Sequence, residues 1–331
     1  MINERFTVLD GWRGISILLV LACHLMPLGP KHWELNNVAG LMGMSLFLTL
    51  SGFLITHFLL YRPNIFDFLI RRLLRILPLA WLYIVVSLLI FSSNINGWLA
   101  HLLLYVNYVP YFFISNVTEH LWSLCVEIHF YLGIALLVAV FKRNSLLIMP
   151  LLCILVTLTR IIMHAHVSVL THLRVDEILA GAVLALIYNN KLGKGLVKFV
   201  TNQNVLFLIV LLVISSYKFS GFMMYLRPYF SALLVGSTLF NSDKKIAKFL
   251  ENKVLVYIAT ISYALYILHP LLASTWLGSG FGWDKYLKRP LLFIAIFFGA
   301  HCSTFYFEKH FIALGKKVTN RSLATLKYAK R

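Results

Sequence analysis

The sequence predicts an all-α protein, a bundle of helices that crosses a membrane many times. Of its 331 residues, 60% are hydrophobic and 13% are charged, whereas a soluble domain carries about 25% charged residues. The mean hydropathy is +0.81, and apolar stretches recur along nearly the whole length with no shift that marks a separate soluble domain. A soluble core cannot bury that much apolar surface, so we expect lipid to be the solvent.

Eleven apolar segments are candidates for crossing the membrane. They cover residues 9–29, 38–60, 75–92, 98–115, 123–141, 145–163, 176–190, 204–218, 228–241, 254–276 and 289–308. The segment 98–115 differs from the rest because it holds His101, Asn107 and Pro110, and Asn116 follows directly after it. Such a composition suits an interfacial or re-entrant stretch.

Loop charge decides how many segments cross. If the N-terminus is cytoplasmic and 98–115 does not cross, every strong basic cluster lies on the cytoplasmic side, as the bias of Lys and Arg toward cytoplasmic loops requires. If 98–115 crosses, the clusters from Lys142 to Lys253 are placed outside. We therefore predict about ten transmembrane helices with both termini in the cytoplasm. The net charge of +18 then reflects these loops, and we expect no nucleic-acid partner.

The four cysteines lie in apolar segments without paired spacing, so they predict small core residues and neither a disulfide framework nor a metal site. The first apolar run follows a polar N-terminus and is expected to be a retained span, not a cleaved signal.

Arg13 and His24 are the first candidate site residues, because an ionisable side chain within a membrane usually faces a cavity or a partner. They are 11 residues apart, which puts them on one helical face with a rise of about 16 Å. Arg13 then lies near the cytoplasmic end and His24 near the outer end. The structural alternatives are a membrane-surface anchor paired with Asp10 and a core histidine with a satisfied hydrogen bond.

Arg72 and Arg75 form the second candidate, since they are neighbours on one helical face just before the third span. Two guanidinium groups there can bind phosphates from the cytoplasmic side. The alternative is ordinary positive-inside anchoring.

Glu127 is the third candidate, about one turn inside the outer end of the span that opens at His120-Leu121-Trp122. A carboxylate opposite His24 can fix the imidazole tautomer and stabilise its charge. The alternative is a structural hydrogen bond to another helix. Weaker polar candidates, each better explained alone as structural, are Ser51, Asp176 and His269.

Several ordered motifs resemble acyltransferase family 3, the membrane-bound O-acyltransferases of the polysaccharide or O-antigen acetylase type. They are LDGWRG at 9–14 followed by His24, SLFLTLSGFLI at 45–55, RLLRILP at 72–78, HLWSLCVEIHFY at 120–131, ISYALYILH at 261–269 and FEK at 307–309. The resemblance covers residues 5–312, and residues 313–331 then form a basic cytoplasmic tail. The family's ten-helix arrangement agrees with the loop-charge count.

The sequence also departs from the family pattern. His310 stands where proline is usual, Ile128 replaces a second glutamate and His129 replaces a glutamine. Only Glu127 of the glutamate pair remains, which argues against a role that needs two carboxylates. We expect that no hydrolase-like domain follows, and the resemblance then implies that the acceptor is handled within the membrane domain.

The resemblance implies transfer of an acyl group, usually acetyl, from acyl-coenzyme A (acetyl-CoA) to a carbohydrate hydroxyl, with no metal. Arg13, Arg72 and Arg75 are then expected to bind the donor. Arg13, His24 and Glu127 are the expected catalytic residues, and the expected substrate-binding residues are Ser51, Trp122, Asp176 and His269. The acceptor is expected to be a lipid-linked or surface glycan, such as lipopolysaccharide O-antigen, and the location a bacterial inner membrane.

The competing hypothesis is a transporter or channel for a small solute, in which the same polar residues line a pathway. The two halves of the sequence show no inverted repeat and no matching pair of helices broken by glycine or proline.

Overall fold

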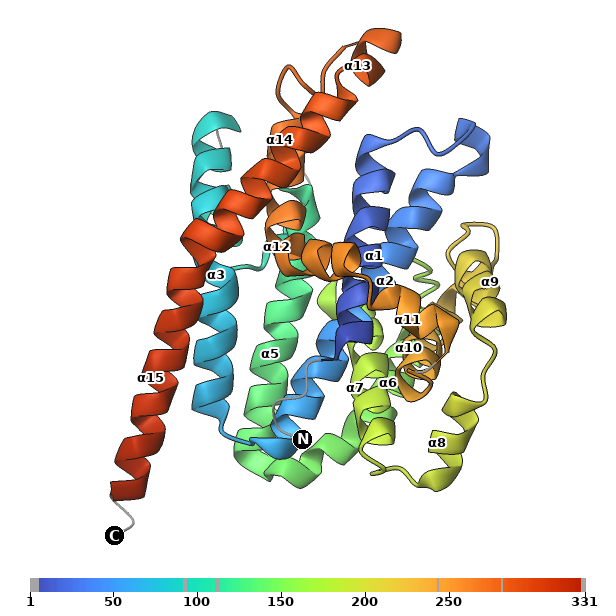
Figure 1. The fold of residues 1–331 in the computed structure, drawn as a ribbon, viewed down its shortest axis with the longest axis vertical. Coiled ribbons are helices and arrows are strands. Elements are labelled where there is room, and N and C mark those ends of the chain that lie inside the picture. Colours follow the sequence, from blue (N-terminus) through green and yellow to red (C-terminus); the bar gives the residue numbers. More distant parts are fainter. Residues whose placement is uncertain (1–5, 92–93, 111–113, 243, 281, 329–331) are drawn as a thin grey trace.

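The computed structural model describes residues 6–91, 94–110, 114–242, 244–280 and 282–328, with side chains up to residue 320. Within these ranges the chain is helical and contains no strand. Figure 1 shows the helices as a bundle, with α1 beginning and α15 ending in the lower half of the view. Residue 5, the predicted start of the domain, and residues 329–331 of the predicted tail lie outside the described residues.

Seven helices of the described chain are long and apolar enough to cross a membrane. This finding agrees with the prediction of an all-helical membrane protein. Including adjoining turns, they cover Thr7–Leu25, Lys31–Tyr61, Ile65–Phe91, Glu119–Phe141, Arg143–Ile162, Lys253–Ala273 and Trp283–Asn320. An eighth span is possible if α8 (Lys194–Thr201) and α9 (Val205–Ser215), which are bent by 87° at their junction, act as one.

The ten predicted spans all overlap a helix, but three of these helices are short or less apolar. They are α7 (Asp176–Tyr188), α9 and α10 (Met223–Phe240). At 1.5 Å per residue the 13 residues of α7 extend about 20 Å, less than the hydrocarbon thickness of about 30 Å. Segment 98–115 is not a continuous helix: α4 (Ile95–Leu102) ends early and a 3-10 turn, Val106–Tyr108, follows, with residues 111–113 outside the description.

The third helix, α3 (Ile65–Phe91), begins ten residues before the predicted span, so the arginine cluster lies inside a helix and not in the loop before it. The predicted tail is also largely helical. It continues the last span as α14 (Arg289–Cys302), a π-helical turn (Ser303–Glu308) and α15 (Lys309–Tyr328). Helix α15 runs beside α3 in Figure 1, and Arg71 Nε donates to Thr319 Oγ1 across 3.0 Å.

Helices α1 (Thr7–Leu25), α2 (Leu35–Tyr61), α7 and α12 (Lys253–Ala273) pack at the centre. Between α2 and α7 two glycines face the opposite backbone. A Cβ on Gly52 would lie 1.8 Å from the carbonyl oxygen of Ile178, and one on Gly181 would lie 1.9 Å from that of Thr49. Both distances are far below van der Waals contact, so only glycine permits this approach. The close packing fixes Ser51 and its neighbours in the centre of the bundle.

Candidate active site

Two cavities lie against opposite halves of α1. The first, which we name the arginine pocket, has a volume of about 790 Å³ and is bounded by α1, α2, α3, α12, the π-helical turn and α15. Six basic and two acidic side chains line it, together with His57. The basic ones are Arg13, Arg62, Arg71, Arg72, Arg75 and Lys316, and the acidic ones are Asp10 and Glu308. This excess of positive charge suits a polyanionic ligand.

Arg13 reaches the arginine pocket because its neighbours in the LDGWRG motif are fixed on other faces of α1. A Cβ on Gly11 would lie 2.1 Å from the carbonyl oxygen of Leu250, so this face of α1 touches backbone. Trp12 is buried and donates from Nε1 to Thr238 Oγ1 across 2.8 Å. With these two faces packed, the next residue along the helix turns to the cavity.

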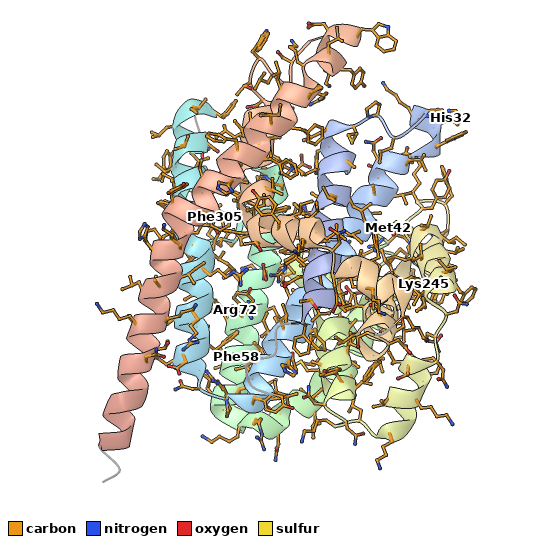
Figure 2. All side chains as sticks on the ribbon, viewed as in Figure 1. His32, Met42, Phe58, Arg72, Lys245 and Phe305 are labelled. Carbon is orange, nitrogen blue, oxygen red and sulfur yellow. The ribbon has the colours of Figure 1, made fainter. Side chains whose placement is uncertain are left out.

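The arginines of α3 are arranged as the i, i+3 spacing predicts, since both Arg72 and Arg75 line this cavity. Arg72 and Phe58 lie close together in Figure 2 and share a smaller adjoining pocket of about 190 Å³. On the opposite wall, Glu308 accepts hydrogen bonds from Ser303 Oγ (3.0 Å) and Thr304 Oγ1 (3.1 Å) within the π-helical turn. Such turns concentrate at functional sites.

The second cavity, which we name the histidine pocket, has a volume of about 470 Å³ and lies at the end of α1. Its wall includes His24 in the last turn of α1, which is exposed. The other chemically notable wall residues are Glu34, Glu119, His120, Trp122, Arg174, Lys218 and Tyr266. Arg13 and His24 therefore each line a cavity, at separate positions along one helix.

Three histidines from three elements meet at the histidine pocket. The ring of His269 lies with its centre 5.2 Å from that of His24 and 5.6 Å from that of His120. His269 is buried, and its Nδ1 lies 2.8 Å from the carbonyl oxygen of Tyr266. Because a carbonyl only accepts, Nδ1 carries a proton there. His269 thus packs behind His24 and does not line the cavity itself.

The structure does not bring Glu127 to His24, contrary to the sequence expectation. Its Oε1 accepts hydrogen bonds from Ser51 Oγ (2.7 Å) and from Tyr131 OH (2.5 Å). It also lies within electrostatic range of Arg13 and of Arg75 in the other pocket. The physical reason is both depth and facing: Glu127 on α5 (Trp122–Phe141) comes seven residues after His120 in the preceding 3-10 turn, about 10 Å of helix, and it faces Ser51 of α2. The acids on the wall of the histidine pocket are Glu34 and Glu119.

A thin layer separates the two pockets. On α2, Met44 lines the histidine pocket and Leu54 lines the arginine pocket, and Ser51 lies between them in sequence. On α12, Tyr263 lines the arginine pocket and Tyr266 lines the histidine pocket, so the boundary between the pockets lies between these two residues. The hydroxyl of Tyr266 lies 2.6 Å from Ser123 Oγ and also donates to the carbonyl oxygen of His120.

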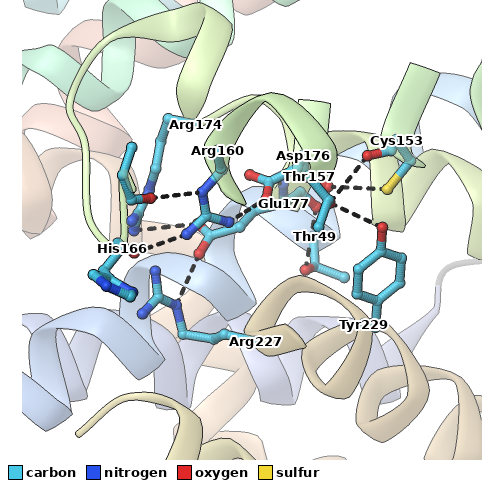
Figure 3. Close-up of polar contacts among 11 residues, drawn as sticks. Thr49, Cys153, Thr157, Arg160, His166, Arg174, Asp176, Glu177, Arg227 and Tyr229 are labelled. Carbon is cyan, nitrogen blue, oxygen red and sulfur yellow. Dashed lines mark hydrogen bonds and ion pairs between the residues drawn. The ribbon is translucent and has the colours of Figure 1, made fainter. Parts of the chain in front are cut away.

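A buried ionic network beside the pockets was largely missed by the sequence reading (Figure 3). Asp176 pairs with Arg160, and Glu177 pairs with both Arg174 (3.2 Å) and Arg227 (3.1 Å). None of these side chains is more than 1% exposed. Asp176, expected to bind substrate, is therefore fully enclosed and bonded, and the geometry supports a structural role for it. The sequence signal was available, since arginines within apolar segments need an acidic partner.

No group of three or more His, Cys, Asp or Glu side chains in the described part of the chain is arranged to hold a metal ion. Of the expected substrate-binding residues, Trp122 lines the histidine pocket and Ser51 lies in the layer between the pockets.

A family model for the acyltransferase domain, Acyl_transf_3, matches residues 6–309. The chain belongs to acyltransferase family 3. The resemblance found in the sequence motifs is thereby confirmed, over nearly the range expected. Membership of an acyltransferase family, together with the long apolar helices, favours a multi-pass membrane enzyme over the transporter hypothesis.

Relatives of this family 3 chain carry O-acetyltransferase names. It is 28% identical over 312 residues to "Putative O-acetyltransferase SACOL0978" of Staphylococcus aureus (strain COL), covering 79% of this chain and 49% of that protein. It is 25% identical over 316 residues to the peptidoglycan O-acetyltransferase OatA of Listeria monocytogenes serovar 1/2a (strain ATCC BAA-679 / EGD-e), covering 81% and 49%. The chain thus spans about half the length of these relatives. No solved structure matches it.

For this family 3 chain, sequence reasoning found Arg13, Arg72 and Arg75, which the structure brings together, and His24 with Trp122, which share the other pocket. It missed most other wall residues, among them Arg62, Lys316, Glu119 and Arg174. Arg62 and Lys316 belong to the basic clusters that indicated only the orientation of the chain. Tyr263 and Tyr266 lie in a motif of the family, which is a signal for them, but neither is among the predicted site residues.

Proposed function

We propose that this chain is a membrane O-acetyltransferase that takes an acetyl group from acetyl-coenzyme A and delivers it to a carbohydrate hydroxyl. One observation carries the proposal: the arginine pocket and the histidine pocket lie against the same helices, α1, α2 and α12, with a thin layer between them. One cavity has the charge for an anionic donor, and the other has the imidazoles that acyl transfer to a hydroxyl requires.

The arginine pocket suits the donor because coenzyme A carries a diphosphate and a further phosphate. Guanidinium groups bind phosphate oxygens with paired N–H donors. Arg72 and Arg75 come from one helical face, and Arg13 approaches from a different helix. We assign Arg72 and Arg75 to the phosphates and Arg13 to the part of the donor nearer the reacting thioester.

In this proposal the arginine pocket opens to the cytoplasm, where acyl-coenzyme A is made, and the histidine pocket opens to the outer side. Arg62 after α2, the arginines at the start of α3 and Lys316 of α15 line the arginine pocket, in line with the positive-inside bias. The ten predicted helices then cross a bacterial inner membrane with both termini in the cytoplasm. Helices α7 and α9 are short for this, so local thinning or tilt of the surrounding helices is needed around them.

His24 is proposed as the group that activates the acceptor. The sugar oxygen attacks the thioester carbonyl carbon, a C–O bond forms and the C–S bond breaks. The imidazole takes the proton of the hydroxyl, and the leaving coenzyme A thiolate takes up one proton. In the covalent variant of this scheme a nitrogen of His24 first carries the acetyl group. His269, packed against His24, positions the ring, while Glu127 tunes the charge around Arg13.

The acceptor is proposed to be a lipid-linked or surface glycan of the cell envelope. The histidine pocket supports this because it mixes an aromatic ring, Trp122, with polar side chains, a composition that suits a sugar face. A relative is named for peptidoglycan, so a peptidoglycan-type amino sugar joins O-antigen and exopolysaccharide among the acceptors to be tested.

The test compares His24→Ala with His32→Ala in purified protein reconstituted into nanodiscs. His32 is a matched control because it is an exposed histidine in the turn after α1 and is not on the pocket wall (Figure 2). Acetyl transfer from labelled acetyl-coenzyme A should be lost in His24→Ala, by about 10²-fold or more, and retained in His32→Ala. Mass spectrometry of envelope glycans from cells carrying each variant identifies the acceptor. Full transfer by His24→Ala would remove the assignment.

A further inference from the structure

The buried ionic network contains one more cation than anions. Asp176 has Arg160 as its partner and Glu177 has Arg227, so these four charges balance in pairs. Arg174 shares Glu177 with Arg227 and is the surplus cation. It is 1% exposed. A buried charge without a counter-charge is costly, so an arginine retained in this position points to a negative charge that comes from elsewhere.

Arg174 also differs from Arg160 and Arg227 in lying on the wall of the histidine pocket. Its Nη2 faces Glu177, but Nε and Nη1 have no hydrogen-bond partner among the described residues. Its guanidinium lies 5.2 Å from the ring centre of Trp122, another wall residue. This cation–π contact ties the guanidinium to the pocket wall, where its two unpartnered nitrogens are buried.

The other charged groups of the wall do not supply the missing anion. Lys218 and Glu34 pair with each other. Glu119, the remaining acid on the wall, has no ion pair to Arg174 within the described part of the chain. Each unpartnered nitrogen of Arg174 can donate to an oxygen of a carboxylate or a phosphate. The parallel pair of donors that a guanidinium offers on either edge is Nη2 with Nε or Nη2 with Nη1.

We propose that the acceptor is an anionic saccharide whose carboxylate or phosphate binds the guanidinium of Arg174 at Nε or Nη1 while its hydroxyl reaches His24. The acyl-transfer half of this inference rests on the proposed function; the anion site does not. Trp122 lines the same pocket and contacts Arg174, so its ring is placed to cover the face of a sugar bound there.

Binding is tested without turnover, by thermal unfolding of the purified chain in detergent with sodium phosphate, sodium glucuronate or sodium chloride at equal ionic strength. Ligands that bind only the folded state raise the melting temperature. The wild type should be stabilised by glucuronate if the anion is a carboxylate and by phosphate if it is a phosphate. Phosphate can also bind the arginine pocket, which Arg174→Gln keeps, so the Arg174 site is measured as the part of the rise that the variant loses. Equal stabilisation of the variant and the wild type, or none beyond chloride for the wild type, would overturn the site.

Arg289→Gln is the matched control, because Arg289 also has guanidinium nitrogens without a partner among the described residues but lines a different, mostly apolar pocket. It should keep the anion response. Arg174→Gln should fold, since Asp176 and Glu177 each keep an arginine. If it does not, Arg174→Lys keeps the charge but lacks the paired donors, and it should bind the anion about tenfold or more weakly. A lysine variant with wild-type binding would also contradict the geometry.

The acceptor preference is measured separately. A glucuronate-containing oligosaccharide and a neutral glucose oligosaccharide of the same length are compared, together with a sugar phosphate, as acceptors of labelled acetyl. The wild type should prefer a charged acceptor, and Arg174→Gln should reduce that preference at least about tenfold. A wild type that transfers equally to neutral and charged sugars contradicts the anionic acceptor. If no acceptor is acetylated by the wild type, the proposed function fails while the unfolding result still decides the anion site.

Discussion

Tyr263 and Tyr266 lie three residues apart on α12, yet Tyr263 lines the arginine pocket and Tyr266 lines the histidine pocket. Their separation along the helix is about 4.5 Å. Both hydroxyls are tied to other helices, Tyr263 to the carbonyl oxygen of Ile76 (2.6 Å) and Tyr266 to Ser123 and His120. On α12 the two cavities are therefore divided by less than one helical turn. We call this boundary the tyrosine partition.

Replacing Tyr266 by alanine should open the tyrosine partition. The ring stacks 6.2 Å from Phe47 and its hydroxyl joins α12 to α5, so its loss lets water reach the donor thioester. We expect acetyl-coenzyme A hydrolysis without acceptor to rise several-fold relative to transfer, because exclusion of water prevents such side reactions. Release of coenzyme A is followed with a thiol reagent.

Tyr266→Phe is the control for this experiment, since it keeps the ring and removes only the hydroxyl. Hydrolysis should stay near the wild-type rate, with a stability loss of about 1–3 kcal/mol from the lost hydrogen bond. Hydrolysis that is unchanged in Tyr266→Ala would show that the partition does not keep water from the donor.

Arg72→Gln and Arg75→Gln should each weaken donor binding. A hydrogen bond to a charged group contributes about 1.5–3 kcal/mol, so KM for acetyl-coenzyme A should rise about tenfold to a hundredfold while kcat changes less. Lys245→Gln is the charge-matched control, an exposed cation on α11 (Lys245–Leu250) that does not line the pocket (Figure 2). A similar rise in KM for Lys245→Gln would mean that general surface charge, not the pocket, attracts the donor.

Asp176→Asn should destabilise the protein without a specific effect on the acceptor. Arg160 is then left buried with no carboxylate, and breaking a buried pair on one side costs about 3–5 kcal/mol. The double variant Arg160→Met with Asp176→Asn should recover much of that loss. Thermal unfolding of the single and double variants measures both. A raised KM for acceptor with unchanged unfolding would instead restore the substrate-binding role expected from the sequence.

Gly52→Ala should disrupt the packing of α2 on α7. The added Cβ would overlap the carbonyl oxygen of Ile178, and overpacking of this kind costs about 1–3 kcal/mol or more. Gly133→Ala is the control, because no atom lies within 4 Å of the Cβ built there. The folded yield from membranes and the melting temperature should fall for the first variant and stay level for the second.

The sequence predicted the helical membrane class because hydropathy is a property of each segment taken alone. Pocket residues on one helix were predicted for the same reason: Arg13 with His24, and Arg72 with Arg75, follow from helical spacing. The number of helices that cross the membrane was harder to predict, since α7 and α9 are short and α3 begins before its apolar stretch. The basic residues at the start of α3 lower its local hydropathy, so a hydropathy profile does not show where this helix begins.

Contacts between helices were the part of the structure that the sequence predicted least well. Glu127 and His24 were matched by estimated depth, but the carboxylate bonds Ser51 and Tyr131 instead. A depth estimate fixes the height of a side chain and not the neighbour it faces. The ionic network was missed for a related reason, because Arg174 and Arg227 come from separate segments and share a single acid, Glu177. No periodic pattern in one helix encodes such a meeting.

The tyrosine partition also has an electrical consequence under the proposed function. The proton released by the sugar and the proton taken up by the coenzyme A sulfur belong to opposite sides of it. If the partition passes acetyl but no proton, each turnover moves the equivalent of one positive charge outward. A membrane potential that is negative inside opposes this by about 2.3 kcal/mol per 100 mV. By keeping protons from passing between the two pockets, Tyr263 and Tyr266 would thus couple acetylation of the envelope to the membrane potential.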